Sequence, residues 1–303
     1  MKFVAGVPGV SHFPTITDPW MKAMAAPDYQ RVCCALEDIG FDSIDCPEHL
    51  AIDARLVASM GAYWPHAATA MAFFAGATQR IRVNACVIML PLHHPIGLAK
   101  SLSTLDVLSG GRVTFTVGLG HGEGEFRAFG VPFHQRGRIA DEYLEAIQIL
   151  WTHDAPEFRG RHVAFDGIAF EPKPLQRPVP VWIGGNVDAA IRRAVRFGTG
   201  WRPSVVGLEE LPAYQEKIAR FAEERGREAQ VELHIPSGPV TMRLDHSIVD
   251  APPPGTAELV DRIGKLAALG VGWTSLPAIK AASLDEYLDR LANEHGPILA
   301  QCR

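Results

Sequence analysis

The sequence is poor in several features that would each point to a particular class of protein. It has five cysteines in 303 residues, and no two of them form a Cys-x-x-Cys pair. The odd number argues against a disulfide framework, and the spacing fits no zinc site. No apolar stretch reaches the ~18 residues that a membrane-spanning helix needs. We found no Ser-His-Asp signature, no Gly-x-Ser-x-Gly motif and no phosphate-binding P-loop motif.

Positive charge is also scarce relative to negative charge. The 29 Lys and Arg residues are outnumbered by 34 Asp and Glu residues, which gives a net charge of −5. A broad nucleic-acid-binding face is therefore not expected. The first ten residues contain one lysine and no long apolar core, so they read as a β-strand and not as a signal peptide. We expect a cytoplasmic protein whose partners include neither a membrane nor a nucleic acid.

The chain is rich in alternating strand and helix patterns. Hydrophobic residues make up 47% of it and charged residues 21%, which suits a large core. Apolar, β-branched runs predict strands at 2–7, 41–46, 81–90, 113–117, 179–183, 200–202, 231–235 and 271–278. Helical spacing of apolar residues predicts helices at 28–39, 67–78, 98–108, 139–151, 188–197, 208–225, 257–269 and 284–294.

Eight strand–helix pairs in order predict an α/β fold, a (β/α)8 TIM barrel, over residues 1–303 as a single domain. Weak alternation over residues 158–170 predicts a hairpin inserted before strand five. In such a barrel the chemistry lies on the loops that follow the strands. The candidate residues are therefore expected in those eight loops.

The loop after the second strand opens with Glu48 and His49. A carboxylate beside an imidazole at a strand end can bind a polar heterocycle and move a proton near neutral pH. The alternative is a Glu–His pair that only caps a long polar loop. His93 and His94 follow the third strand, but no acidic residue stands at metal-ligand spacing from them, so we expect polar loop residues and no metal site.

The loop after the fourth strand carries glycine at every second position, from Gly118 and Gly120 onward. It does not match Gly-x-Gly-x-x-Gly, and no acidic residue ends the next strand, so a dinucleotide site is disfavoured. Glycines here would let the backbone approach a flat ring. His121 and Glu123 are candidate acid–base groups, or else solvated loop residues.

After the fifth strand, Gly184, Gly185 and Asn186 lead into a helix. Backbone N–H groups at a helix N-terminus favour an anion, so a phosphate site is predicted here; the alternative is a tight strand–helix turn. Arg192 and Arg193 could add charge to this site or could face water.

Several short motifs together resemble the bacterial luciferase-like monooxygenase superfamily, in particular its predicted F420-dependent oxidoreductases. They are 36–43 (LEDIGFDS), 47–49 (PEH), 90–95 (LPLHHP), 104–112 (TLDVLSGGR), 125–126 (EF), 136–138 (RGR) and 182–185 (WIGG). The matching motifs span about the first two hundred residues, and the ordered set is specific although no single motif is.

The resemblance implies a barrel that holds the deazaflavin F420, or alternatively FMN, at its C-terminal face. It implies a bulge in the third strand, often with a non-proline cis peptide, which carries to Cys86 and Val87, with Ile88 next. The ring would lie against this bulge, framed by Gly118 and Gly120. The resemblance also assigns the carboxylate–histidine pair to Glu48 and His49, and the phosphate contacts to the Gly184–Asn186 turn.

The resulting hypothesis is F420-dependent hydride transfer to or from a small organic substrate. His49, oriented by Glu48, would stabilise charge or move a proton, and His121 is the second candidate. The alternatives are an FMNH2-dependent monooxygenase supplied by a partner flavin reductase, and a non-catalytic flavin-binding barrel. Family likeness also suggests a homodimer through the helices near strands two and three. The loops 51–65 and 236–254, with Met60, Tyr63 and Trp64 in the first, suggest an apolar substrate of medium size.

Overall fold

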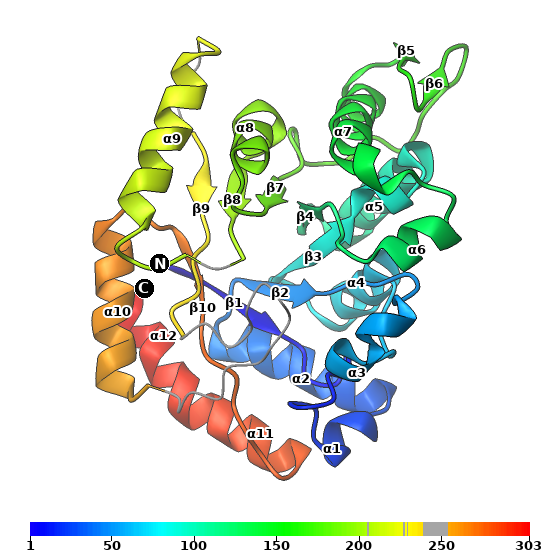
Figure 1. Cartoon of the computed structure of the whole chain (residues 1–303). Helices are drawn as coiled ribbons and strands as arrows, with labels where there is room; N and C mark the ends of the chain where they lie inside the picture. The colour runs from blue at the N-terminus through cyan, green and yellow to red at the C-terminus, as the bar shows by residue number, and fades with distance from the viewer. Residues whose placement is uncertain (205, 227, 229, 239–253) are drawn as a thin grey trace.

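The computed structural model describes residues 1–204, 206–226, 228, 230–238 and 254–303. Eight parallel strands form its central sheet (Figure 1). Around the sheet their order is β10 (Trp273–Ser275), β1 (Lys2–Gly6), β2 (Ser43–Cys46), β3 (Arg82–Met89), β4 (Val113–Gly118), β7 (Val181–Gly184), β8 (Gly200–Arg202) and β9 (Glu232–Leu233). This is the predicted (β/α)8 barrel in a nearly closed form.

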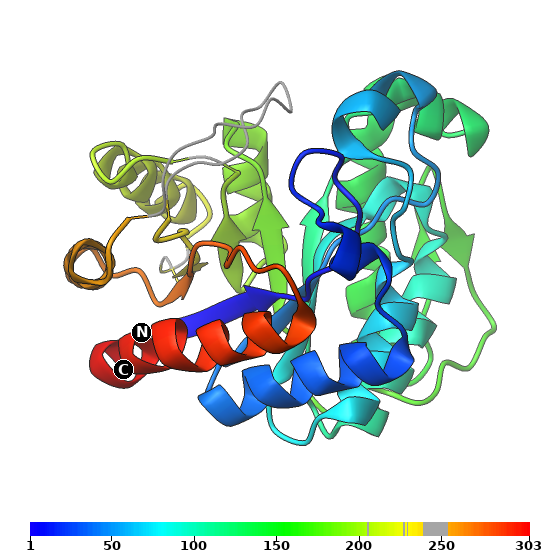
Figure 2. The ribbon, with the colours of Figure 1, turned by 90° about the horizontal axis from the view of Figure 1, so that it is seen from below.

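The barrel closes where β9 meets β10. His234 forms a parallel bridge with Trp273, and the Ile235 amide donates to the Trp273 carbonyl at 3.1 Å. Figure 2 shows α2 lying beside α11 and α12, so the two ends of the chain meet on one side of the barrel. Arg31 of α2 and Asp285 of α11 form an ion pair there, at 2.5 Å.

Helices surround the sheet. They are α1 (Pro19–Lys22), α2 (Ala26–Ile39), α3 (Val57–Met60), α4 (Ala67–Ala77), α5 (Pro95–Ser109), α6 (Glu123–Ala128), α7 (Arg136–Thr152), α8 (Asp188–Phe197), α9 (Leu211–Glu223), α10 (Thr256–Ala268), α11 (Leu284–Arg290) and α12 (Gly296–Cys302). Local sequence sets several of their ends. Pro95 occupies the first turn of α5, where its missing N–H costs nothing, and Gly110 ends the helix at φ 71°.

Most expected elements are present, with shifted ends. The predicted inserted hairpin is found as β5 (Phe158–Arg159) and β6 (Ala164–Phe165), which projects beyond α7 in Figure 1. Glu142 of α7 holds this hairpin by accepting hydrogen bonds from three successive backbone amides, Arg161 to Val163. The substrate-side loop expected at 236–254 lies outside the described residues from 239 to 253.

Four of the observed helices were missed. Two of them, α1 and α3, are only four residues long; the other two are α6 and α12. α6 begins at Glu123, inside the stretch that its glycines made look like a loop. α12 follows a short π-helical segment, Leu291–His295, and carries Pro297 in its first turn. A proline after a helical pattern reads as a stop, but in a first turn it is compatible with a helix.

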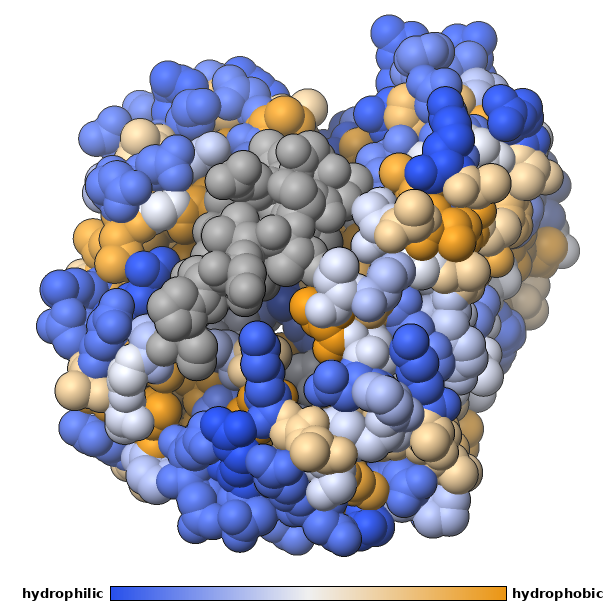
Figure 3. All heavy atoms as spheres, turned by 60° about the horizontal axis from the view of Figure 1, so that its bottom comes forward, coloured by the Kyte–Doolittle hydropathy of each residue, from blue (hydrophilic) through white to orange (hydrophobic). Residues whose placement is uncertain are grey.

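The protein has a large hydrophobic core between the barrel sheet and the helices, and a smaller hydrophobic cluster inside the barrel. Between the sheet and the helices lies one large apolar cluster. Inside the barrel Val4, Trp182 and Trp273 pack together, and polar side chains lie around them. The outer surface seen in Figure 3 is mainly hydrophilic, with hydrophobic residues scattered over it. Among the described residues no helix is both long and apolar enough to cross a membrane.

Candidate active site

The third strand carries a bulge at the end that leads to the barrel mouth. Its register against β4 shifts between Cys86 and Ile88, and the Cys86–Val87 peptide is cis. A Cβ added to Gly118 would clash with the Val87 side chain, and one on Gly184 would lie 3.5 Å from it. β4 and β7 therefore end in glycine where Val87 needs room. The bulge and cis peptide implied by the resemblance are found at the expected residues.

Space is available beside this bulge. Gly6 ends β1, two residues beyond Val4 of the barrel interior, and a Cβ added to it would meet no atom within 4 Å. Because side chains alternate along a strand, Gly6 faces the same interior as Val4. Glycines at the ends of β1, β4 and β7 thus keep the mouth clear of side chains next to Cys86 and Val87.

His49 is held by a carboxylate that the sequence analysis did not assign to it. Its Nδ1 lies 2.9 Å from Oε2 of Glu125, and both side chains are at least nine-tenths buried. The other carboxylate oxygen accepts from the backbone amides of Leu50 and Ala51, at 2.8 and 2.9 Å. An ionised carboxylate only accepts hydrogen bonds, so this contact favours the tautomer with the hydrogen on Nδ1 and leaves Nε2 as the nitrogen that can accept a proton.

The predicted orientation of His49 by Glu48 is wrong. Oε2 of Glu48 lies 2.7 Å from Nε2 of His93, and Oε1 accepts from the backbone amide of Ala67 at 3.0 Å. Adjacent residues leaving a strand point in different directions, which separates these two neighbours. Burial by itself would raise the pKa of Glu48, but the hydrogen bonds from His93 and Ala67 outweigh it and lower the pKa.

Two further rings contact His49. Trp64, from the loop after β2, meets it edge to face with centroids 4.7 Å apart, and His121 does so at 5.7 Å. The structure therefore brings both predicted histidines together at the mouth, His49 buried and His121 exposed. Met60, expected on the substrate side, is buried instead.

The alternating glycines after β4 have steric roles. Gly120 adopts φ 72°, and a Cβ on it would press on Phe126 and Met89. A Cβ on Gly124 would overlap the carboxylate of Asp53, which accepts a hydrogen bond from the Gly124 amide at 2.7 Å. These contacts dock α6 against the loop after β2, and so bring Glu125 to His49.

A polar network crosses the barrel below the bulge. Asp45 of β2 pairs with Arg202 of β8, with Nη1 and Oδ2 2.5 Å apart, although these strands lie on opposite sides of the barrel. Asp45 also accepts from Asn84 at 2.8 Å, and Asn84 accepts from Thr116 at 3.1 Å. Burial raises the pKa of the Cys86 thiol to about 12, so it is protonated at neutral pH.

The turn after β7 leads into α8 as predicted. Gly185 adopts φ 106°, and Val187 at the helix start makes no side-chain capping bond, so the first amides are left for a ligand or solvent. The side-chain oxygen Oδ1 of Asn186 accepts from the Ser204 backbone amide at 2.9 Å. Arg193 is buried, and its Nε lies 2.5 Å from Oδ1 of Asp141. Arg192 forms an ion pair with Glu224. Both arginines therefore have partners outside this turn.

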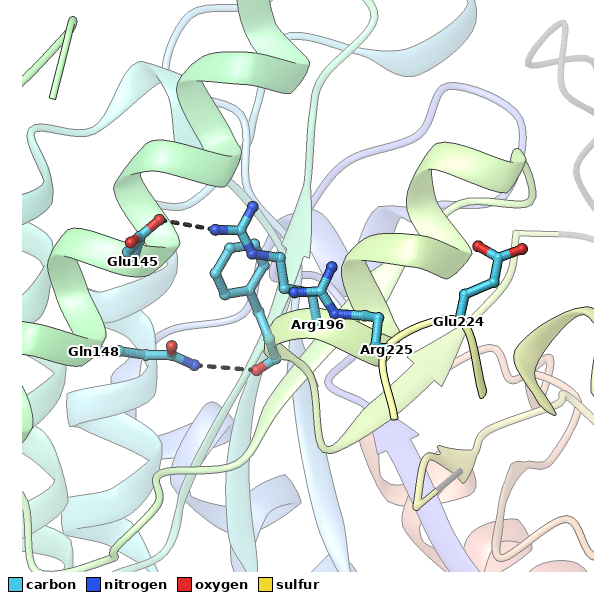
Figure 4. A pocket seen from close by; sticks show the side chains of 6 residues that line it. Glu145, Gln148, Arg196, Glu224 and Arg225 are labelled. Atoms are coloured by element: carbon cyan, nitrogen blue, oxygen red, sulfur yellow. Dashed lines mark hydrogen bonds and ion pairs between the residues drawn. The ribbon is translucent and has the colours of Figure 1, made fainter. Parts of the chain in front are cut away.

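A separate surface groove of about 540 Å³ lies between α7, α8 and α9. Glu145 and Arg196 pair across it, and Arg225 and Glu224 lie on its other side (Figure 4). These residues stand near the C-terminal ends of their helices, which return to the opposite end of the barrel from the mouth. That end of a barrel is associated with stability and not with catalysis.

The fold and mouth described above define a (β/α)8 barrel that carries a buried carboxylate–histidine pair and a bulged third strand at its open end. Residues 11–250 match the family described as luciferase-like monooxygenase, and the chain belongs to that family. Relatives that match this chain include enzymes named as monooxygenases.

Three comparisons illustrate the relationship. An uncharacterized protein of Mycobacterium tuberculosis is 35% identical over 158 residues, which cover 52% of this chain and 54% of that protein. The FMNH2-dependent dimethylsulfone monooxygenase of Pseudomonas putida is 30% identical over 237 residues, 76% of this chain and 63% of that enzyme. The chain thus spans between half and two thirds of these curated relatives.

The third comparison concerns the fold. The structure of an F420-dependent secondary alcohol dehydrogenase in complex with an F420–acetone adduct superimposes with a TM-score of 0.75. The alignment covers all of both chains at 17% identity. At this identity the likeness shows a shared barrel.

Proposed function

We propose that this protein is an F420-dependent oxidoreductase that transfers hydride to or from a small organic substrate. The observation that carries the proposal is the Glu125–His49 pair at the same barrel mouth as the Cys86–Val87 bulge. The mouth thus contains a proton acceptor, His49, that Glu125 holds in place, and strand ends where glycines leave space. The motif resemblance to F420-dependent oxidoreductases supports the choice of cofactor.

The residues at the mouth fit a flat cofactor. Cys86 and Val87 would back the ring, and Gly6 leaves open space at the mouth. Gly184, Gly185 and Asn186 would hold the phosphate at the start of α8. When bound, the deazaflavin supplies a site that accepts or donates hydride.

His49 then handles the proton that accompanies the hydride. In an oxidation its Nε2 accepts the proton of a substrate hydroxyl, and in a reduction it returns that proton. Glu125 stabilises the doubly protonated ring, because its carboxylate already accepts from Nδ1. His121 is the second group that can exchange protons at this place, and Trp64 limits access of water to His49.

The test is to titrate the purified protein with F420 and, separately, with FMN while following the fluorescence of each cofactor. We expect saturable binding of F420 and weaker binding of FMN. Binding of neither cofactor would overturn the proposal. A Gly184→Val variant, which crowds Val87 and the phosphate turn, is expected to lose binding while keeping its fold by circular dichroism.

A second candidate function is an FMNH2-dependent monooxygenase that receives reduced flavin from a partner reductase. The observation in its favour is the 30% identity to dimethylsulfone monooxygenase over 76% of this chain. The same His49 and Glu125 would serve as the proton-handling pair. Oxygen consumption that requires both FMNH2 and substrate would select this function over hydride transfer.

We further propose a homodimer formed through α4 and α5. The exposed positions of their adjacent outer faces carry no charged residue, and Leu108 is 79% exposed. These positions are Thr69, Ala72, Phe73, Gly76, Gly97, Ser101, Val107 and Leu108. Uncharged helix faces favour association. Light scattering of the wild type and of Leu108→Glu tests this, with a dimer expected to become a monomer.

A further inference from the structure

Aromatic rings from the loops after β1 and β2 form two groups near the mouth, and one of these groups ends at His49. His12 and Tyr63 stack with centroids 4.0 Å apart and an interplanar angle of 13°. Phe13 meets Trp64 edge to face at 5.0 Å, and Trp64 meets His49 in the same way at 4.7 Å. Aromatic rings have thus been gathered from two loops on one side of the mouth.

A backbone contact joins these two loops, and a side-chain bond fixes Trp64 within its own loop. The His12 amide donates to the Tyr63 carbonyl at 3.0 Å, and the Trp64 indole donates to the Gly61 carbonyl at 3.2 Å. Gly61 adopts φ 74°, and any Cβ there would collide with the His12 carbonyl. The ring positions are therefore fixed by the main chain, which reduces the entropy that a ligand must overcome.

Tyr63 is the exposed residue among these rings, at 54%. His12 covers one face of its ring, since the two rings are nearly parallel. The uncovered part of Tyr63 therefore offers a flat surface. Offset stacking on such a ring favours planar π-systems over saturated groups of equal area.

Three charged pairs near the mouth are compensated within the protein, and Lys22 adds a positive charge near His12. Asp53 pairs with Arg55 at 2.6 Å on the loop after β2, Glu125 pairs with His49, and Asp45 pairs with Arg202. An ionic substrate would have to compete with these existing partners. A neutral substrate avoids that desolvation cost.

We propose that the surface formed by Tyr63 and Trp64 recognises a neutral substrate that carries a planar aromatic ring and places its reacting group beside His49. The proposal rests on the proposed oxidoreductase function and names its substrate class. It differs from the substrate of the dimethylsulfone monooxygenase relative, which has no ring. Stacking on Tyr63 is expected to contribute about a three- to tenfold preference for a ring over its saturated counterpart.

The experiment measures binding of three probes by calorimetry, with and without saturating cofactor. They are 2-naphthalenemethanol, its fully saturated decalin counterpart and the anion 2-naphthoate. We expect the first to bind at least threefold more tightly than either of the others. Tyr63→Ala should remove that preference, whereas Tyr63→Phe, which keeps the ring, should retain it.

Equal affinity for the saturated probe, tighter binding of naphthoate, or an unchanged preference in Tyr63→Ala would each overturn the substrate assignment. Failure of the proposed oxidoreductase function has a different signature, because it would appear as absent binding of F420 and FMN in the separate cofactor titration. The measurements without cofactor still report on the ring surface in that event.

Discussion

Two buried Glu–His pairs lie near the barrel mouth, and they engage opposite nitrogens of their imidazoles. Glu125 holds His49 through Nδ1, and Glu48 holds His93 through Nε2. Nδ1 lies beside the main chain and Nε2 lies at the tip of the ring. The first pair thus leaves Nε2 of His49 available to a ligand. In the second pair, Nε2 of His93 is already bound to Glu48 and contributes to the fold.

The two carboxylates also anchor different parts of the protein. Besides its histidine, Glu48 accepts from the first amide of α4, at Ala67, and more weakly from Met89 at 3.4 Å. It therefore joins α4, the end of β3 and His93. Glu125 fastens only the loop that carries His49. The comparison indicates that the Glu125 pair serves chemistry and the Glu48 pair serves stability, and the following predictions test that division.

The largest effect is expected from His49→Ala. Loss of the proton acceptor should lower kcat by about 10²- to 10⁴-fold, while the free energy of unfolding changes little because Glu125 keeps its two backbone partners. Steady-state kinetics and denaturant unfolding check both parts. His94→Ala, at an exposed position nearby, is the control. Turnover within twofold of wild type would support a non-catalytic barrel or another proton acceptor.

Glu48→Ala should show the opposite pattern. It removes the partner of a buried histidine and of the first amide of α4, so the free energy of unfolding should fall by about 3–5 kcal/mol. Urea unfolding measures the loss, and the exposed Glu258→Ala is the control. At urea concentrations below its unfolding transition, the Glu48→Ala variant should keep a kcat within about tenfold of wild type. A loss of less than 1 kcal/mol would contradict a structural role for Glu48.

Glu125→Gln sharpens the comparison by keeping shape and removing charge. The amide oxygen can still accept from Leu50 and Ala51, but its NH2 group then faces Nδ1 and favours the tautomer with hydrogen on Nε2. We expect kcat to fall about 10- to 100-fold with KM nearly unchanged. Nitrogen-15 NMR of the histidine ring should show the change of tautomer. An unchanged tautomer together with full turnover would rule out this positioning role.

The sequence was sufficient for the barrel, because each strand and helix has its own hydrophobic period. It was also sufficient for the bulge at Cys86, through the family resemblance. It was not sufficient for the partner of His49. Glu125 lies 76 residues away, and adjacency in the chain favoured Glu48 instead. The one available signal was the Glu125-Phe126 motif, which carried no indication of what the carboxylate contacts.

The smallest effect concerns acid stability. The pKa of Glu48 is lowered in the folded protein, so its stabilising contribution is present above the ordinary carboxyl pKa of about 4.3 and is lost as the pH falls toward the lower, folded-state value. Glu48→Gln lacks this titration. Between about pH 5 and pH 3 the Tm of this variant should therefore fall less steeply than that of the wild type, and Glu258→Gln should follow the wild-type slope. Parallel slopes for Glu48→Gln and the wild type would mean that the ionised form of Glu48 gains no stability from its bond with His93, and the division between the two pairs would then rest on kcat alone.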